Sequence, residues 1–179
     1  YVPRSSIAIT GKKLKKRNEI TNSYLESVSI VCKNNKFKLW LDTSGLLASA
    51  RNQPLGSLSD IDLLIKGGNI LTLYELLMKE REDWIIKTNA STNRPIENTQ
   101  IAIYSSSLFN EDLEPAVIDI RGSAYNPHLL KKPKLLEFHF LENSNFLKNT
   151  VLMYPRMHEN YLDDIYGVNW RIPDEFYQK

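Results

Sequence analysis

The sequence predicts an α/β or α+β domain in which a short mixed sheet is flanked by helices. Apolar residues recur at helical spacing before residue 35, and short runs rich in β-branched and aromatic residues recur after it. The first pattern is typical of an amphipathic helix and the second of buried or half-buried strands. Because segments of both kinds are mixed along the chain, we expect helices to cover the sheet.

The expected elements can be placed in order from their patterns and their terminal residues. Helices are expected around the stripe at residues 20–31, at 46–51, after the capping residue Asn69, and at 161–166, where Gly167 ends the last one. Strands are expected at 37–41, 61–65, 84–87, 99–104 and 117–120, with a weaker one at 135–141. The polar segment 88–98 predicts a hairpin between two of them.

Composition limits the classes of function. The length of 179 residues fits one domain, 1–179, although a chain that begins at Tyr1 could be excised from a longer protein. The 23 basic and 21 acidic side chains nearly balance, so no footprint for nucleic acid is expected. The basic run at residues 12–17 is interpreted as the solvated start of a helix, with contact to a membrane surface or polymer as the alternative. Cys32 is the only cysteine, which excludes an intramolecular disulfide, and no apolar run is long enough to span a membrane.

The most informative motif is a pair of aspartates at the start of an apolar run. Asp60 and Asp62 are two positions apart in Leu-Ser-Asp-Ile-Asp-Leu-Leu-Ile, so on a strand both carboxylates point to one face. Two carboxylates in an apolar setting are costly unless a cation or donors compensate them. Mg²⁺ prefers such oxygen ligands, so the pair predicts a metal site; the alternative is the solvated turn chemistry that this motif often serves.

A second motif precedes this pair. The run at 37–41 reaches a turn of small residues at 43–45 and then a short helix. A strand that leads into a helix through Ser44 and Gly45 presents backbone N–H groups to an anion. Arg51 follows near the end of that helix, where a guanidinium could bind phosphate oxygens in a forked geometry. We therefore expect Ser44, Gly45 and Arg51 to bind the phosphates of a substrate.

Together these motifs resemble the LicD/fukutin-type phosphotransferases of the nucleotidyltransferase-fold superfamily. Residues 44–51, Ser-Gly-Leu-Leu-Ala-Ser-Ala-Arg, and the pair Asp60 and Asp62 are similar to the family's GTLLGAVR and WDDDIDI elements. Residues 159–162 and 166–173 are similar to its closing elements. The sequence departs from the family at Ser44-Gly45, at Ala48, and in the acidic tract, which is Gly-Ser-Leu-Ser at 56–59. The resemblance implies a nucleotidyltransferase-like fold.

The resemblance also implies a third carboxylate on a later strand. Asp119 is the best candidate, because it lies in the β-branched run 116–121 between Pro115 and Gly122. We expect it to join Asp60 and Asp62 as a ligand of Mg²⁺ or Mn²⁺ and to accept the proton of an incoming hydroxyl. The alternative is a structural aspartate paired with Arg121.

The implied enzyme is a LicD-type phosphotransferase. Such an enzyme moves a substituted phosphate, for example phosphocholine or ribitol phosphate, from a CDP-linked donor to a glycan hydroxyl of a cell-surface polysaccharide. The implied location is the cytoplasm of a bacterium or the Golgi lumen of a eukaryote. Two alternatives stay open at this point. One is a nucleotidyltransferase that transfers NMP from an NTP, and the other is an inert domain that binds a nucleotide or glycan. Tyr161, Tyr166 and Trp170 could form a wall against a cation or a base, or simply close the core.

Overall fold

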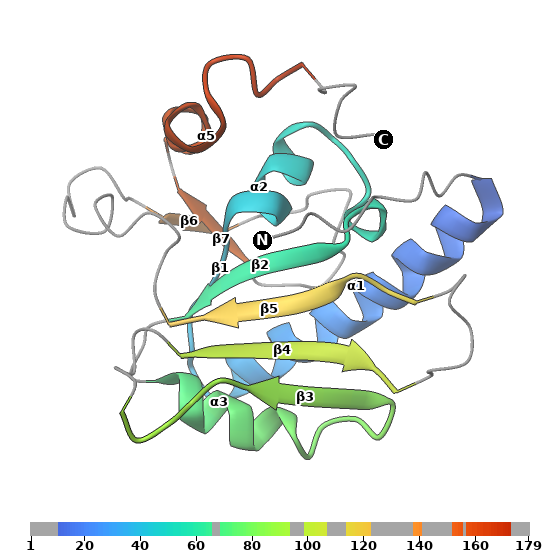
Figure 1. Ribbon diagram of the computed structural model, residues 1–179, viewed down its shortest axis with the longest axis vertical. Helices are drawn as coiled ribbons and strands as arrows, with labels where there is room; N and C mark the ends of the chain where they lie inside the picture. Colours follow the sequence, from blue (N-terminus) through green and yellow to red (C-terminus); the bar gives the residue numbers. More distant parts are fainter. Residues whose placement is uncertain are drawn as a thin grey trace.

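A mixed sheet of seven strands organises the part of the chain that the computed structural model describes, which comprises residues 11–65, 69–93, 99–106, 114–122, 138–140, 152–155 and 157–172 (Figure 1). The strand order is β3-β4-β5-β2-β1-β7-β6. β2 lies parallel to β5 and β1 lies parallel to β7, whereas all other neighbours are antiparallel. The strands are β1 (Leu39–Leu41), β2 (Asp60–Ile65), β3 (Trp84–Thr88), β4 (Gln100–Ser105), β5 (Val117–Arg121), β6 (Phe138–Phe140) and β7 (Met153–Pro155).

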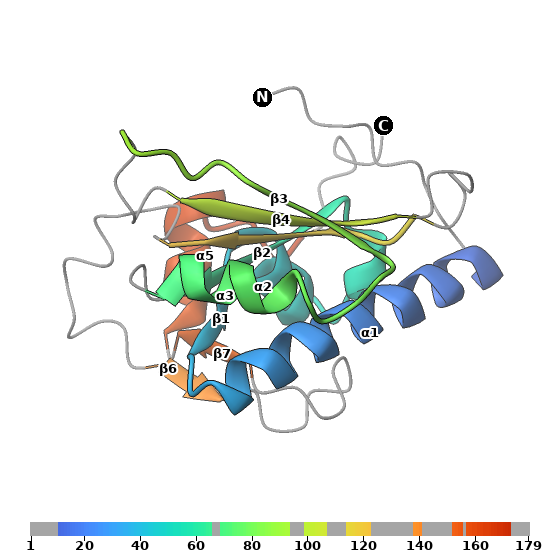
Figure 2. The same cartoon turned by 90° about the horizontal axis from the view of Figure 1, so that it is seen from below.

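Helices cover the sheet, as the sequence predicts. Figure 2 shows α1 (Gly11–Asn34) and α3 (Ile70–Leu77) on one side of β3, β4 and β5. The other helices are α2 (Thr43–Ala50), the 3₁₀ turn η1 (Leu55–Ser57) and α5 (His158–Tyr166). Within the described residues, no helix combines the length and the apolar surface that crossing a bilayer requires.

The expected order of helices and strands is confirmed, with differences at several ends. β1 starts at Leu39 rather than at residue 37, because the Phe37 N–H group still bonds the Cys32 carbonyl at 2.8 Å and Lys36 has φ +58°. Both features belong to the turn that ends α1. α5 begins at residue 158, three residues before the expected start, and β6 covers the described part of the weak strand expected at 135–141.

The two faces of the central strands differ in exposure. Along β4 and β5, buried residues alternate with half-buried ones: Ile101, Ile103, Ile118 and Ile120 are fully buried. The intervening residues of β5, which include Asp119, point to the opposite face. The carboxylate of β5 therefore lies on the side away from the core under α1 and α3.

Polar side chains of α1 hold the segments that lead into β2 and β5. Arg17 donates from Nε to the Glu114 carbonyl and from Nη1 to the Gly56 carbonyl, both at 2.5 Å. The Thr21 hydroxyl accepts the Ala116 N–H at 3.2 Å. The expectation of a solvated basic run is therefore wrong at Arg17, which is 8% exposed because its guanidinium bonds backbone carbonyls at the sheet end. The lysines of the run are exposed, as predicted.

Candidate active site

The register of two parallel strands brings the three predicted carboxylates together. Asp62 of β2 lies directly beside Asp119 of β5, and Asp60 precedes Asp62 on the same face. One carboxylate oxygen from each residue lies within 4.8 Å of one oxygen from each of the other two. Asp62 is buried, and Asp60 and Asp119 are half-buried. Three carboxylates at this distance form a candidate site for a divalent cation.

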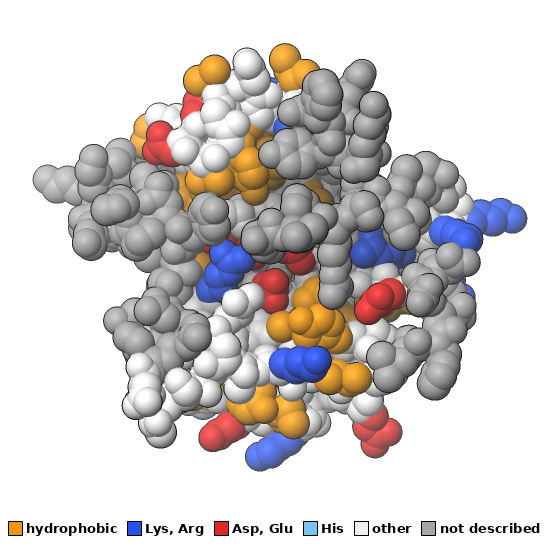
Figure 3. All heavy atoms as spheres, in the orientation of Figure 1, with side chains coloured by type: hydrophobic (Ala, Val, Ile, Leu, Met, Phe, Trp, Pro, Cys, Tyr) orange, Lys and Arg blue, Asp and Glu red, His pale blue; other side chains and the backbone are white. Residues whose placement is uncertain are grey.

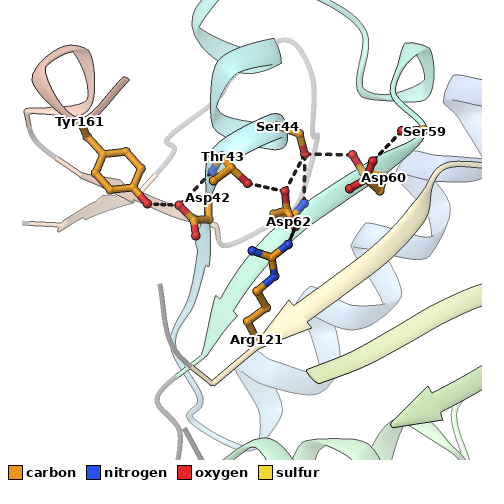
Figure 4. A network of polar contacts seen from close by, with 8 residues as sticks. All are labelled: Asp42, Thr43, Ser44, Ser59, Asp60, Asp62, Arg121 and Tyr161. Atoms are coloured by element: carbon orange, nitrogen blue, oxygen red, sulfur yellow. Dashed lines mark hydrogen bonds and ion pairs between the residues drawn. The ribbon is translucent and has the colours of Figure 1, made fainter. Parts of the chain in front are cut away.

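Asp62 has hydrogen-bond partners on both carboxylate oxygens (Figure 4). Arg121 donates from Nη2 to Oδ1 at 2.5 Å, and the side chains are 26% and 6% exposed, respectively. On the other oxygen, the Thr43 hydroxyl donates a hydrogen bond and Ser44 Oγ lies at 3.1 Å. Arg121 shares its face of β5 with Asp119, since the two residues are two positions apart, but its ion pair is with Asp62.

Asp119 has a different electrostatic setting. Burial, together with the neighbouring charge of Asp62, raises the pKa of Asp119 to about 6. A hydrogen bond with the Gln100 side chain and the charge of Arg121 oppose that rise. A carboxyl group with this pKa can hold or accept a proton near neutral pH, which is the property that a general base requires.

Asp42 and Tyr161 support the start of α2, although Tyr161 lies far from it in the sequence. Asp42 caps α2: its Oδ1 accepts the Thr43 N–H at 2.9 Å and also a hydrogen bond from the Tyr161 hydroxyl of α5. Both residues are buried, at 1% and 5% exposure. Thr43 has φ +28°, which is unusual for a β-branched residue and requires firm support from its surroundings. Asp42 and Tyr161 thus fix the hydroxyl that bonds Asp62.

The three residues predicted to bind phosphate make specific contacts within the protein. Ser44 Oγ donates to the Asp60 carbonyl at 2.9 Å, which ties α2 to β2. A Cβ added at Gly45 would lie 3.0 Å from side-chain atoms of both Ile61 and Leu41, so the glycine permits close packing of α2 on the sheet. Arg51 donates from Nε to the Trp170 carbonyl at 2.5 Å and from Nη2 to that of Ile172 at 3.2 Å. Phosphate binding by these residues stays a prediction.

Sequence reasoning missed four residues of the network. The role of Asp42 could have been predicted from the sequence, because an aspartate before small polar residues is a typical helix N-cap. Thr43 was noted only as a small turn residue, and Arg121 only as a partner for Asp119. Tyr161 was predicted to form a wall or to close the core, and its bond to Asp42 spans 119 residues. No local pattern reveals a contact of that separation.

The site faces the side of the molecule that Figure 3 displays. Near the middle of that face, over β2 and β5, acidic and basic side chains lie next to each other. Below them, over β3 and β4, hydrophobic side chains surround a basic one. Lys87 of β3 has its Nζ 5.3 Å from the centre of the Tyr104 ring of β4.

Comparisons with known proteins give similarity to solved structures but no match to a family model or a curated protein. The crystal structure of ANT(2″)-Ia in complex with adenylyl-2″-tobramycin aligns with 89% of this chain and 86% of its own, at a TM-score of 0.46 and 9% sequence identity. Membership of the LicD/fukutin family is therefore not shown.

Proposed function

We propose that this protein is a metal-dependent transferase that acts on the phosphates of a nucleotide-activated donor. The observation that carries the proposal is the cluster of Asp60, Asp62 and Asp119, with one oxygen of each within 4.8 Å of the others. It lies beside the start of α2, where Ser44 bonds both β2 and Asp62. A carboxylate site next to a helix N-terminus suits a metal-bound diphosphate.

The chemistry of the donor set fits Mg²⁺ or Mn²⁺. All three candidate ligands are carboxylates, and hard cations of this kind prefer oxygen ligands. When bound, such a cation would neutralise the donor's phosphate oxygens and stabilise the charge that develops on the leaving group. Asp60, Asp62 and Asp119 would hold it, and the donors on Asp62 would keep that carboxylate in place.

The side chains around the cluster can be given separate roles. Ser44, the backbone at Gly45 and Arg51 are proposed to bind phosphate oxygens. Asp119 would accept the proton of the attacking hydroxyl. Thr43 and Arg121 would orient Asp62 through its two oxygens.

Two reactions fit this arrangement. In the first, a glycan hydroxyl attacks the distal phosphorus of a CDP-linked donor such as CDP-choline or CDP-ribitol, the bond to the bridging oxygen breaks, and CMP leaves. In the second, a hydroxyl attacks the α-phosphorus of an NTP and pyrophosphate leaves. We favour the first, because it is the reaction that the LicD resemblance of the C-terminal residues 159–162 and 166–173 implies.

Product analysis separates these reactions. The protein is incubated with Mg²⁺ or Mn²⁺ and, in parallel, with CDP-choline, CDP-ribitol, CTP and ATP. Release of CMP from a CDP-linked donor supports the phosphotransferase reaction. Release of pyrophosphate from CTP or ATP instead supports the nucleotidyltransferase reaction. Calorimetry with CDP, with and without metal, tests the inert alternative. That alternative is worth testing because the ion pair with Arg121 compensates the Asp62 carboxylate without a metal. Nucleotide binding that ignores the metal would overturn the catalytic proposal.

A further inference from the structure

Arg121 brings a positive charge into direct contact with the carboxylate cluster. Its Nη2 donates a hydrogen bond to Asp62 Oδ1 at 2.5 Å. Asp62 is one of the three residues whose carboxylate oxygens lie within 4.8 Å of one another. Only 26% of the Arg121 side chain is exposed, so water and salt screen this ion pair less than they screen a pair on the surface. The guanidinium therefore offsets part of the negative charge to which a divalent cation would bind.

The register of the strands explains how the guanidinium reaches Asp62. Asp119 of β5 pairs with Asp62 of β2, and Arg121 lies two positions after Asp119 on the same face. The Arg121 side chain therefore crosses from β5 to β2. Figure 4 shows it approaching Asp62 from the side away from Thr43 and Ser44, which contact the other carboxylate oxygen. A ligand held at Asp62 would thus have the start of α2 on one side and the guanidinium on the other.

A guanidinium group suits phosphate as well as carboxylate. It has five N–H donors in one plane, and the bond from Arg121 to Asp62 uses one of them. Charge-assisted hydrogen bonds from arginine to phosphate oxygens are among the strongest in proteins. Arg51, the arginine that the sequence indicates for phosphate, bonds the backbone carbonyls of Trp170 and Ile172. Arg121, in contrast, already contacts a member of the carboxylate cluster.

We propose that Arg121 has two roles at this site: it competes with a divalent cation for Asp62 Oδ1, and it donates a hydrogen bond to a phosphate oxygen of the donor. The competition follows because the guanidinium and the cation carry like charges and need the same oxygen. The phosphate contact follows because a diphosphate at the cluster would place negative charge beside the guanidinium. The inference rests on the proposed function, since it assumes a metal–diphosphate group at the cluster.

These roles differ from that of a residue that only orients Asp62. If Arg121 only held Asp62 in place for the cation, its removal would weaken cation binding. If Arg121 competes with the cation, its removal strengthens cation binding and weakens phosphate binding. The two affinities then change in opposite directions, a result that neither a general loss of structure nor a loss of orientation produces.

Calorimetry on the full chain measures both affinities without any turnover. The first titration uses Mn²⁺ alone, and the second uses pyrophosphate at a saturating concentration of Mn²⁺, in wild type and in Arg121→Gln. We expect the Mn²⁺ affinity of Arg121→Gln to rise at least about fivefold, because a like charge beside the site is removed. We expect its pyrophosphate affinity to fall about tenfold or more, the usual scale for losing a hydrogen bond between charged groups.

Arg81→Gln is the matched control. Arg81 has the same exposed fraction, 26%, and forms an ion pair with Asp83 at 2.7 Å. Its guanidinium carbon lies 4.8 Å from the centre of the Tyr24 ring of α1, on the other face of the sheet. Both affinities of Arg81→Gln should stay at the wild-type values. If Arg121→Gln does not fold, Arg121→Met removes the same charge, keeps an unbranched side chain and takes the same two titrations.

The outcomes separate this inference from the proposed function. Weaker Mn²⁺ binding in Arg121→Gln than in wild type would make Arg121 an orienting residue and overturn the competition. Unchanged pyrophosphate affinity in Arg121→Gln would overturn the phosphate contact. Both results leave the proposed function standing. If Mn²⁺ binds to Arg121→Gln and not to the wild type, the competition is supported and the proposed function fails for the natural sequence. If neither protein binds Mn²⁺, both the inference and the proposed function fail.

Discussion

Replacing Asp62 by asparagine should destabilise the metal-free protein, whereas the same change at Asp60 should not. From the sequence alone the two carboxylates are equivalent, and removing either charge should relieve repulsion. The structure separates them. Asp62 is 6% exposed in its side chain and pairs with Arg121 at 2.5 Å, while Asp60 accepts an exposed hydrogen bond from Ser59.

The magnitude follows from these contacts. Removing one partner of a buried ion pair costs about 3–5 kcal/mol. The cost is lower here, because Arg121 keeps a quarter of its side chain in water and because Asp119 is relieved of a neighbouring charge. We expect a net loss of about 1–3 kcal/mol for Asp62→Asn, or a fall in melting temperature of roughly 3–10 °C for a chain of this size. For Asp60→Asn we expect a change within about 0.5 kcal/mol, or a small gain.

Urea unfolding at pH 7 in the presence of a chelator measures both values. Asp62→Asn/Arg121→Gln is the informative control, since replacing both partners removes the unpaired cation and should recover part of the loss. If Asp62→Asn and Asp60→Asn unfold with equal free energies, the reasoning is refuted, because it assigns Asp62 a stabilising ion pair and Asp60 no interaction of comparable strength. A severe loss for Asp60→Asn would refute it as well.

Three further predictions concern the carboxylate of β5 and the loop before β2. The raised pKa of Asp119 means that the folded state holds this proton more tightly than the unfolded state does. The resulting stabilisation is present below pH 4 and is lost as pH rises through about 6. The free energy of unfolding of the metal-free protein, measured by chemical denaturation across this range, should decline in wild type and not in Asp119→Asn. The same variant should lower turnover at least about 10²-fold while donor affinity, measured by calorimetry, falls far less; unchanged turnover would remove Asp119 from the site. Gly56→Ala should cost about 1–3 kcal/mol in urea unfolding, because its Cβ would lie 2.4 Å from the Asn18 Cα, and Ser57→Ala on the same turn should cost much less.

The sequence predicts most of the elements because their signals are local. Side chains two positions apart on a strand share a face, so Asp60 and Asp62 of β2 can be placed together without any knowledge of the rest of the fold. The β-branched run of β5 likewise marks Asp119 as a strand residue. What the sequence does not contain is the register that sets Asp62 beside Asp119, since parallel strands are paired across a long connection.

Long-range contacts explain the errors. Arg17 belongs to a run of basic residues that reads as a solvated face, and only the fold shows that its guanidinium binds the carbonyls of Gly56 and Glu114. Those carbonyls lie just before β2 and β5. Arg17, which the sequence places in a solvated basic run, therefore holds the segments that lead into the two strands that carry the carboxylates.

Each carboxylate of the cluster is compensated in a different way, which bears on how metal binding relates to folding. Asp62 has an arginine and a hydroxyl donor, Asp60 has a hydroxyl at the exposed edge, and Asp119 has a raised pKa that lets it take up a proton. A cluster with such partners does not require a cation in order to fold. A bound cation would have to displace the proton of Asp119 and share Asp62 with Arg121, so its affinity should fall as pH drops below about 6. Metal binding and folding should thus be separable, in contrast to structural metal sites whose proteins unfold when the ion is removed.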